Sequence, residues 1–206
     1  MKDHSQYGEK AILDRYFEQR EGFFLDIGAA DGITNSNTYH LAQQGWSGVL
    51  IEPCQHFLTT LREMYADSSR VKIFDGALSD FDGKTSFYVY ETGGDSQIST
   101  IDLRQKESIE SGGWFKGKFT ESYDVNVLTP TSFCAQMGVP KKIEFVDIDA
   151  EGSDMKILNS WPWEQYDVEL FCIEHSMGKE ALINFMLTKG YRMTFGTAGN
   201  HFFVKC

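Results

Sequence analysis

The sequence of 206 residues has few cysteines, no run of basic residues and no hydrophobic stretch of membrane-spanning length. Its four cysteines are widely separated, with neither C-x-x-C spacing nor a histidine at zinc-finger distance, which argues against a zinc finger and a dithiol redox motif. The first residues lack the apolar core of a secretory signal. We therefore expect a reduced, cytoplasmic protein with no membrane partner.

Positive charge is also scarce. Thirty acidic residues oppose nineteen lysines and arginines, and the formal net charge is −11. A protein that binds nucleic acid gains affinity by neutralising phosphates, so this balance argues against DNA or RNA as the main partner, and also against anionic membranes. The proportions of hydrophobic residues (41%) and charged residues (24%) are those of a globular protein, and the length suits one compact domain.

Five apolar runs rich in valine, isoleucine and phenylalanine predict the strands of a sheet. Continuous apolar runs are typical of parallel strands that are buried on both faces under helices. The runs are residues 23–27, 49–51, 71–74, 145–148 and 168–173, with helix-compatible stretches at 37–44, 55–65, 153–158 and 178–189 and a leading helix at 10–18, within residues 1–20. This alternation predicts a doubly wound, Rossmann-like α/β sheet in three layers, formed by residues 1–206 as one domain.

Three segments depart from this rhythm. Residues 191–195 and 201–205, joined by a small polar turn, predict a hairpin that places an antiparallel strand at the C-terminus of a mostly parallel sheet, as in class I methyltransferases. Residues 84–90 alternate polar and apolar side chains and predict a short extra strand. Residues 91–124 are polar but contain Trp114, Phe115 and Phe119, which predicts either a substrate-facing lid or a mobile insert.

The first predicted strand ends in a turn suited to a small ligand. Asp26 is followed by Gly28, Ala29, Ala30 and Asp31, and small residues let backbone N–H groups approach a ligand closely. A nicotinamide cofactor requires three glycines at set positions, which this turn does not have. S-adenosylmethionine carries a positive ammonium and a positive sulfonium, and it has no pyrophosphate. Acids at this turn therefore favour S-adenosylmethionine over a dinucleotide.

The next two strands also end in candidate cofactor residues. Glu52, followed by Pro53, lies 24 residues after Gly28, where an acid can accept hydrogen bonds from both ribose hydroxyls. Asp75 can accept from an adenine amino group, with the backbone of Gly76 and Ala77 beside the ring. These residues extend the predicted cofactor site along the carboxyl edge of the sheet.

The last two strands end in the predicted catalytic residues. Alternation places Asp147 and Asp149 on the same side, with Asp149 nearer the edge where ligands bind, and Glu151 follows. His175 follows the fifth strand, and a neutral imidazole can take a proton from a substrate hydroxyl. We expect His175 or Asp149 to act as the base and Glu151 to orient the substrate. Asp149, Glu151 and Glu174 could also supply oxygen ligands for Mg²⁺.

Several motifs occur together in the order found in one enzyme family. They are Ser5-Gln6-x-Gly8-Glu9, residues 24–32 (FLDIGAADG), Ser36-Asn37-Thr38-Tyr39, Gly45-Trp46-x-Gly48-Val49-Leu50-Ile51-Glu52-Pro53, Ser99-Thr100 and Asp149-Ala150-Glu151-Gly152. In this set the chain resembles the FkbM-type methyltransferases.

The resemblance implies an S-adenosylmethionine-dependent enzyme that methylates a hydroxyl of a sugar, a polysaccharide or another small secondary metabolite. By the same resemblance, Asn37 and Thr38 join Asp26, Gly28, Asp31 and Glu52 as cofactor positions, and Gln6 closes over the methionine end. The expected partner is a small-molecule or glycan acceptor. Two alternatives stay open, an NAD-dependent oxidoreductase or epimerase on a similar sheet and a non-catalytic nucleotide-binding module.

Overall fold

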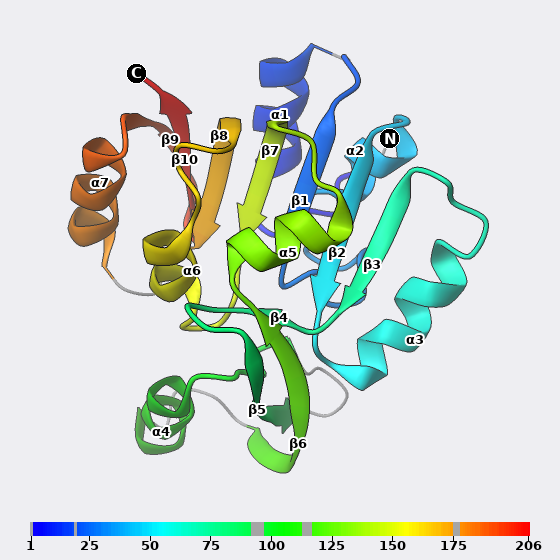
Figure 1. Ribbon diagram of the computed structural model, residues 1–206, viewed down its shortest axis with the longest axis vertical. Coiled ribbons are helices and arrows are strands. Elements are labelled where there is room, and N and C mark those ends of the chain that lie inside the picture. Colours follow the sequence, from blue (N-terminus) through cyan, green and yellow to red (C-terminus); the bar gives the residue numbers. More distant parts are fainter. Residues whose placement is uncertain (1, 19, 92–96, 113–116, 175–177) are drawn as a thin grey trace.

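A computed structural model describes residues 2–18, 20–91, 97–112, 117–174 and 178–206 (Figure 1). Its main sheet has seven strands in the order β3-β2-β1-β7-β8-β10-β9. The strands are β1 (Phe23–Ile27), β2 (Ser47–Glu52), β3 (Val71–Asp75), β7 (Lys142–Ile148), β8 (Asp167–Glu174), β9 (Tyr191–Gly196) and β10 (Asn200–Lys205). Strands β1, β2, β3, β7 and β8 pair in parallel, and β10 is antiparallel to both its neighbours. The prediction of a mostly parallel sheet with an antiparallel C-terminal strand is confirmed.

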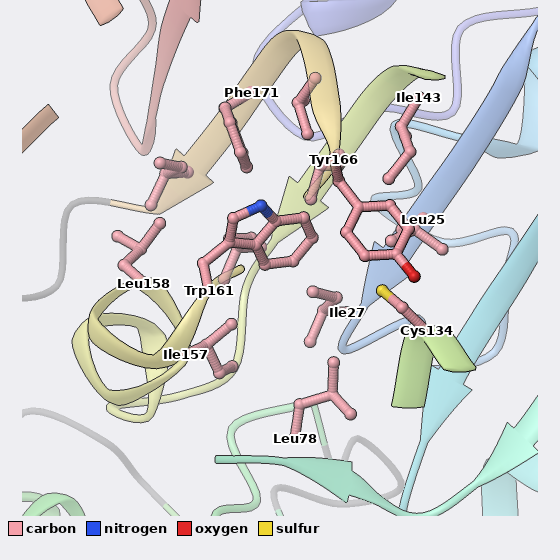
Figure 2. Packing of buried hydrophobic residues seen from close by; sticks show 14 of the residues in the cluster. Leu25, Ile27, Leu78, Cys134, Ile143, Ile157, Leu158, Trp161, Tyr166 and Phe171 are labelled. Atoms are coloured by element: carbon pink, nitrogen blue, oxygen red, sulfur yellow. The ribbon is translucent and has the colours of Figure 1, made fainter. Parts of the chain in front are cut away.

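Helices cover both faces of this sheet. Helices α1 (Glu9–Phe17), α2 (Tyr39–Gln43) and α3 (Gln55–Met64) supply buried residues to one face, and α5 (Pro130–Met137), α6 (Asp154–Ser160) and α7 (Lys179–Thr188) supply the other. Alternation along β1 sends Phe24 to the first face and Leu25 and Ile27 to the second. In Figure 2, Trp161 lies over the second face beside Phe171. The three-layer α/β architecture is therefore confirmed.

A second, smaller sheet lies beyond the carboxyl ends of the parallel strands (Figure 1). It contains β4 (Ala77–Leu78), β6 (Lys118–Leu128) and β5 (Gly83–Glu91) in that order, and α4 (Leu103–Gly112) lies beside it. Strand β5 is the extra strand expected near residues 84–90. Helix α4 and most of β6 fall within residues 91–124, where the sequence predicted a substrate-facing lid or a mobile insert, and Trp114 and Phe115 lie outside the described residues.

The N-terminal and C-terminal segments of the chain are attached to the fold in different ways. The N-terminal segment forms a single parallel bridge between Ser5 and Asn35, which brings it against the loop after β1. The C-terminal strand β10 is central to its half of the sheet, between β8 and β9. None of the helices that the structure describes is long and apolar enough to cross a membrane.

Candidate active site

The turn after β1 lies where the strand order changes direction. Strands β2 and β3 follow on one side of β1, and β7 and β8 lie on the other. Gly28 has φ +98°, and a Cβ placed on it would lie 1.8 Å from the carbonyl oxygen of Asp149. The N–H groups of Gly28 and Ala29 both donate to the carbonyl oxygen of Ile51, at 3.0 and 3.1 Å. The turn is therefore held against both neighbouring strand ends, at the position where open α/β sheets bind ligands.

An apolar cavity of about 520 Å³ opens beside this turn. Its walls come from the ends of β1, β2 and β7, from α3 and from the smaller sheet, and the lining residues are Ile27, Gly28, Ala30, Ile51, Glu52, Pro53, Phe57, Ala77, Leu78, Phe87, Gln97, Ser99, Thr100, Ile101, Asp149, Ala150, Glu151 and Ser153. Most of these side chains are apolar or small. The cavity therefore suits a flat, weakly polar group.

Glu52 is the acidic residue at the end of β2 in this apolar cavity. It is only 5% exposed, and its carboxylate accepts hydrogen bonds from the N–H groups of Ala30 (2.8 Å) and Cys54 (2.6 Å). Burial raises the pKa of Glu52 to about 7, although the two backbone N–H groups oppose that shift. The backbone thus fixes the orientation of this carboxyl, and each of its oxygens keeps a second lone pair.

A polar cavity of about 1150 Å³ adjoins the apolar one. The two share Gly28, Ala30, Gln97, Asp149 and Glu151, and the polar cavity is further lined by Gln6, Tyr7, Asp26, Ala29, Thr34, Asn35, Ser36, Asn37, Ile98, Gln105, Asp147, Glu174 and Asn200. Five of these lining residues are acids, and none of the residues that the structure places in the lining is a lysine or an arginine. The cavity is therefore strongly acidic.

The acids at the β1 side of this cavity are held by the loop before α2. The Thr38 hydroxyl donates to the Asp26 carboxylate, and the Asn37 amide donates to Asp147 at 3.3 Å. Burial raises the pKa of Asp26 to about 6, and burial together with the charge of Asp26 raises the pKa of Asp147 well above its usual range. Carboxyls in this state favour a cationic ligand, because a positive charge stabilises their ionised form.

The acids at the β7–β8 side form a second group. Burial first, and then the charges of the neighbouring acids, raise the pKa values of Asp149 and Glu151 well above normal and that of Glu174 to about 7. Glu151 has φ +47°, and its carbonyl oxygen accepts a hydrogen bond from the Thr100 hydroxyl at 2.7 Å. Within the described ranges, no three His, Cys, Asp or Glu side chains are arranged to hold a metal ion. The geometry gives no support to the expected Mg²⁺ site.

Residues 97–105 cross over the site and line both cavities. The Asn35 amide donates to the Gln97 side-chain oxygen at 3.0 Å, which ties this strap to the loop after β1. On the other side, Thr100 bonds to Glu151 and the Asp102 carboxylate lies 2.7 Å from the Lys156 ammonium on α6. The sequence predicted a lid or insert in this region without identifying its lining residues, although Ser99-Thr100 is one of the family motifs.

The structure brings most of the predicted site residues to the two cavities. Those that line a cavity are Gln6, Asp26, Gly28, Ala29, Ala30, Asn37, Glu52, Pro53, Ala77, Asp149 and Glu151. Four do not line either cavity, namely Asp31, Thr38, Asp75 and Gly76. The Asp31 carboxylate accepts from the N–H groups of Ile33 and Thr34 and so stabilises the turn, and Asp75 forms an ion pair with Arg62 at 2.7 Å. His175 lies outside the described residues.

Sequence reasoning did not identify the apolar lining. Phe57 of α3, Leu78 of β4 and Phe87 of β5 come from three separate elements. The only signal for Phe87 was its place in an alternating segment, and nothing in the sequence showed which face would meet the cavity. Asn200, at the start of β10, was missed for the same reason.

Comparison with known proteins shows the family. The family model described as Methyltransferase FkbM domain matches residues 26–193. The chain belongs to the FkbM methyltransferase family. A methyltransferase FkbM from Methylobacillus flagellatus KT has a similar crystal structure, with a TM-score of 0.55 and 14% sequence identity over 89% of this chain and 43% of that one. This chain therefore spans less than half the length of that FkbM protein.

Other structurally similar methyltransferases have lower TM-scores. A putative RNA methyltransferase from Pyrococcus horikoshii has a TM-score of 0.49 at 13% identity, over 98% of this chain and 87% of that one. TrmK of M. capricolum, in complex with S-adenosyl-homocysteine, has a TM-score of 0.46 at 8% identity, over 98% of this chain and 68% of that one. A search of curated proteins found no match.

The FkbM-type motif at the N-terminus contains a buried carboxylate that holds one wall of the polar cavity. Glu9 is 0% exposed, and its carboxylate accepts hydrogen bonds from the Tyr7 N–H (2.8 Å), the Thr197 hydroxyl (2.8 Å) and the Asn200 amide (3.0 Å). A Cβ on Gly199 would lie 2.5 Å from the Tyr7 ring, so the ring packs directly on that backbone. Glu9 therefore joins the N-terminal segment to the β9–β10 turn.

Replacing Glu9 with glutamine should lower the free energy of unfolding by about 2 kcal/mol, because an amide has one acceptor oxygen and leaves a buried donor unsatisfied. Denaturant unfolding monitored by circular dichroism measures the loss. Glu18→Gln is the matched control, since Glu18 is exposed just after the same helix. Equal stability of the two variants would show that the hydrogen bonds of Glu9 contribute little.

The buried acids of this FkbM family member predict a loss of stability as pH rises. The pKa of Asp26 rises from 3.8 to about 6 and that of Glu52 from 4.5 to about 7. Because each folded pKa lies above its unfolded value, the stabilisation is complete below about pH 4 and is lost as pH rises through about 6 to 7. Between about pH 5 and pH 8 the loss is about 2 kcal/mol per carboxyl.

Denaturant titrations at these two pH values measure this loss, and Glu52→Gln should remove the part that belongs to Glu52. A pH dependence that is unchanged in Glu52→Gln would contradict the assignment to this residue.

Proposed function

We propose that this chain is an S-adenosylmethionine-dependent methyltransferase that methylates a hydroxyl of a sugar, a glycan or another small metabolite. The observation that carries the proposal is the pair of adjoining cavities, one apolar and one acidic, at the carboxyl ends of β1, β2 and β7. S-adenosylmethionine has matching halves, a flat adenosine and a cationic methionine end. Membership of the FkbM methyltransferase family supports the same activity.

The apolar cavity fits the adenosine half of the cofactor. Phe57, Leu78 and Phe87 supply apolar surface for the adenine ring. Glu52 faces this cavity with a fixed orientation, and its free lone pairs can accept hydrogen bonds from the ribose hydroxyls. Asp75 is held by Arg62, so an adenine contact through Asp75 requires that this ion pair open.

The acidic cavity fits the methionine half. Asp26 and Asp147 lie buried at the end of β1 and β7, and both favour a cation in their ionised form. Gln6 lines the same cavity from the N-terminal segment. Thr38 acts on the cofactor through Asp26, to which its hydroxyl donates a hydrogen bond. These residues can bind the ammonium group of the cofactor, and none of the described residues that line the cavity is a lysine or an arginine that would repel it.

Bound S-adenosylmethionine supplies a methyl group that its sulfonium has already activated. The chain's main task is then to hold the acceptor hydroxyl in line with that methyl carbon. The Asp149 carboxylate, which lines both cavities, would accept the proton that the acceptor hydroxyl loses on methylation. His175 stays a second candidate for this base.

A thermal-shift series tests the proposal. S-adenosylmethionine or S-adenosylhomocysteine at about 100 times its Kd should stabilise the protein by about 2.7 kcal/mol, which raises Tm by about 5–10 °C for a chain of this size. NAD should give no shift, because the turn after β1 lacks the glycine pattern that a pyrophosphate needs. A shift with NAD alone would favour the oxidoreductase alternative. Binding of the sulfur compounds without methyl transfer to any acceptor would favour a non-catalytic module.

A further inference from the structure

The acidic cavity contains more carboxyl groups than the proposed cofactor can neutralise in their ionised form. S-adenosylmethionine carries two positive groups and one carboxylate, and so brings a single net positive charge. The cavity holds five carboxyls, and no lysine or arginine lines it in the part of the chain that the structure describes. If Asp26 and Asp147 accept the cofactor, Asp149, Glu151 and Glu174 are left without a counter-charge.

These three acids form one wall at the β7–β8 side of the cavity. Register places Ile148 beside Ile173, so Asp149 and Glu174 follow at neighbouring strand ends. The Asp149 Oδ1 and Glu174 Oε2 atoms are buried, and no N–H or hydroxyl donor among the described residues reaches them, although the two carboxyls lie within hydrogen-bonding reach of each other. Burying such groups is costly unless a ligand supplies donors or charge.

A neutral side chain in the same cavity, that of Asn37, also has a buried acceptor atom that needs a hydrogen-bond donor. Asn37 is only 6% exposed, and its amide nitrogen is used on Asp147 and on the Cys172 sulfur. Its carbonyl oxygen is buried and receives no hydrogen bond from any residue in the described ranges. The cavity therefore presents acceptors that lack donors, and an ammonium group provides several donors together with a positive charge.

We infer that the acceptor is a hydroxyl compound with a positively charged amine, which Glu151 and Glu174 bind while Asp149 faces the hydroxyl. This inference rests on the proposed function and names its substrate class. The same carboxyls repel an acceptor that carries a phosphate or a carboxylate, so sugar phosphates and nucleotides are excluded by charge. Neutral sugars can donate hydrogen bonds to the wall but leave its charge uncompensated.

Calorimetry with the full chain tests the inference in two stages. Binding of S-adenosylhomocysteine is measured first, and it reports on the proposed function alone. The protein saturated with S-adenosylhomocysteine is then titrated with glucosamine, glucose and glucose 6-phosphate, which share a ring and differ in charge. Glucosamine should bind about ten-fold more tightly than glucose, a difference of about 1.4 kcal/mol, and glucose 6-phosphate should bind most weakly.

The double variant E151Q/E174Q tests which residues cause this preference. Replacing mutually repelling buried carboxyls with amides of the same size should leave the fold and the S-adenosylhomocysteine affinity intact, and should remove the ten-fold preference. Glu164→Gln, an exposed residue that lines neither cavity, is the matched control and should keep it.

Three outcomes overturn the inference. They are no binding of glucosamine, equal affinity for glucosamine and glucose, and a preference that survives in E151Q/E174Q. Failure of S-adenosylhomocysteine to bind in the first stage refutes the proposed function, and the inference with it.

Discussion

Replacing Gly28 with alanine is expected to lower the free energy of unfolding by more than about 4 kcal/mol, in the range where single substitutions prevent folding. The alanine Cβ would lie 1.8 Å from the Asp149 carbonyl oxygen, far inside van der Waals contact. Neither backbone can move away easily, because Asp149 donates to the Ile27 carbonyl at 2.9 Å and Gly28 donates to Ile51 at 3.0 Å. The measurement is denaturant unfolding, with Tm as a second reading.

Gly138→Ala is the matched control for this prediction. Gly138 also has a positive φ, +67°, but no atom lies within 4 Å of a Cβ placed on it. Its replacement carries the backbone strain alone, which costs about 1–2 kcal/mol. If Gly28→Ala were no more destabilising than Gly138→Ala, the close packing of the β1 turn against the end of β7 would be wrong.

The parts of the fold that were predictable share one physical origin. Strands β1, β2, β7 and β8 are buried on both faces, so each leaves a largely apolar run in the sequence, whereas β3, at the edge of the sheet, exposes Lys72. The turn after β1 was recognisable for a similar reason, since a position with φ +98° next to a neighbouring carbonyl accepts little other than glycine. Both signals are local, and each is visible in a few consecutive residues.

The parts that were not predictable depend on contacts between distant segments. Strand β6 alternates polar and apolar side chains at Tyr123, Val125 and Val127, but it buries only two of its eleven residues, so the part within residues 91–124 carries a weak signal. Asp75 was predicted to bind adenine from its place at a strand end, but the sequence could not show that Arg62 of α3 would pair with it. The strap of residues 97–105 depends on Asn35, Glu151 and Lys156, which lie far away in the chain.

The two groups of acids in the polar cavity couple ligand binding to the release of protons. The carboxyls are gathered by parallel strand ends, so burial and mutual repulsion raise their pKa values together. A cationic ligand reverses the effect, because it stabilises the ionised forms. Ligand binding should therefore release protons, and the proposed base is ionised by the same event that brings the substrate.

Asp149→Asn should lower kcat by about 10²–10³-fold, the range typical for the loss of a positioned general base. Asparagine has nearly the same shape, so the affinity for S-adenosylmethionine should change little, because Asp26 and Glu52 remain. Steady-state transfer of a labelled methyl group measures kcat, and calorimetry measures the cofactor affinity. Asp67→Asn is the control, since that acid is exposed, lines neither cavity and should keep normal turnover.

The ratio of the two effects decides the role of Asp149. A loss of cofactor affinity as large as the loss of kcat would make Asp149 a cofactor ligand and leave His175 as the base. An unchanged kcat would remove Asp149 from the chemistry. Because burial and the neighbouring acids raise the pKa of Asp149 in the free enzyme, wild-type kcat/KM should rise with pH at higher pH than an ordinary aspartate would give, and in Asp149→Asn that rise should disappear.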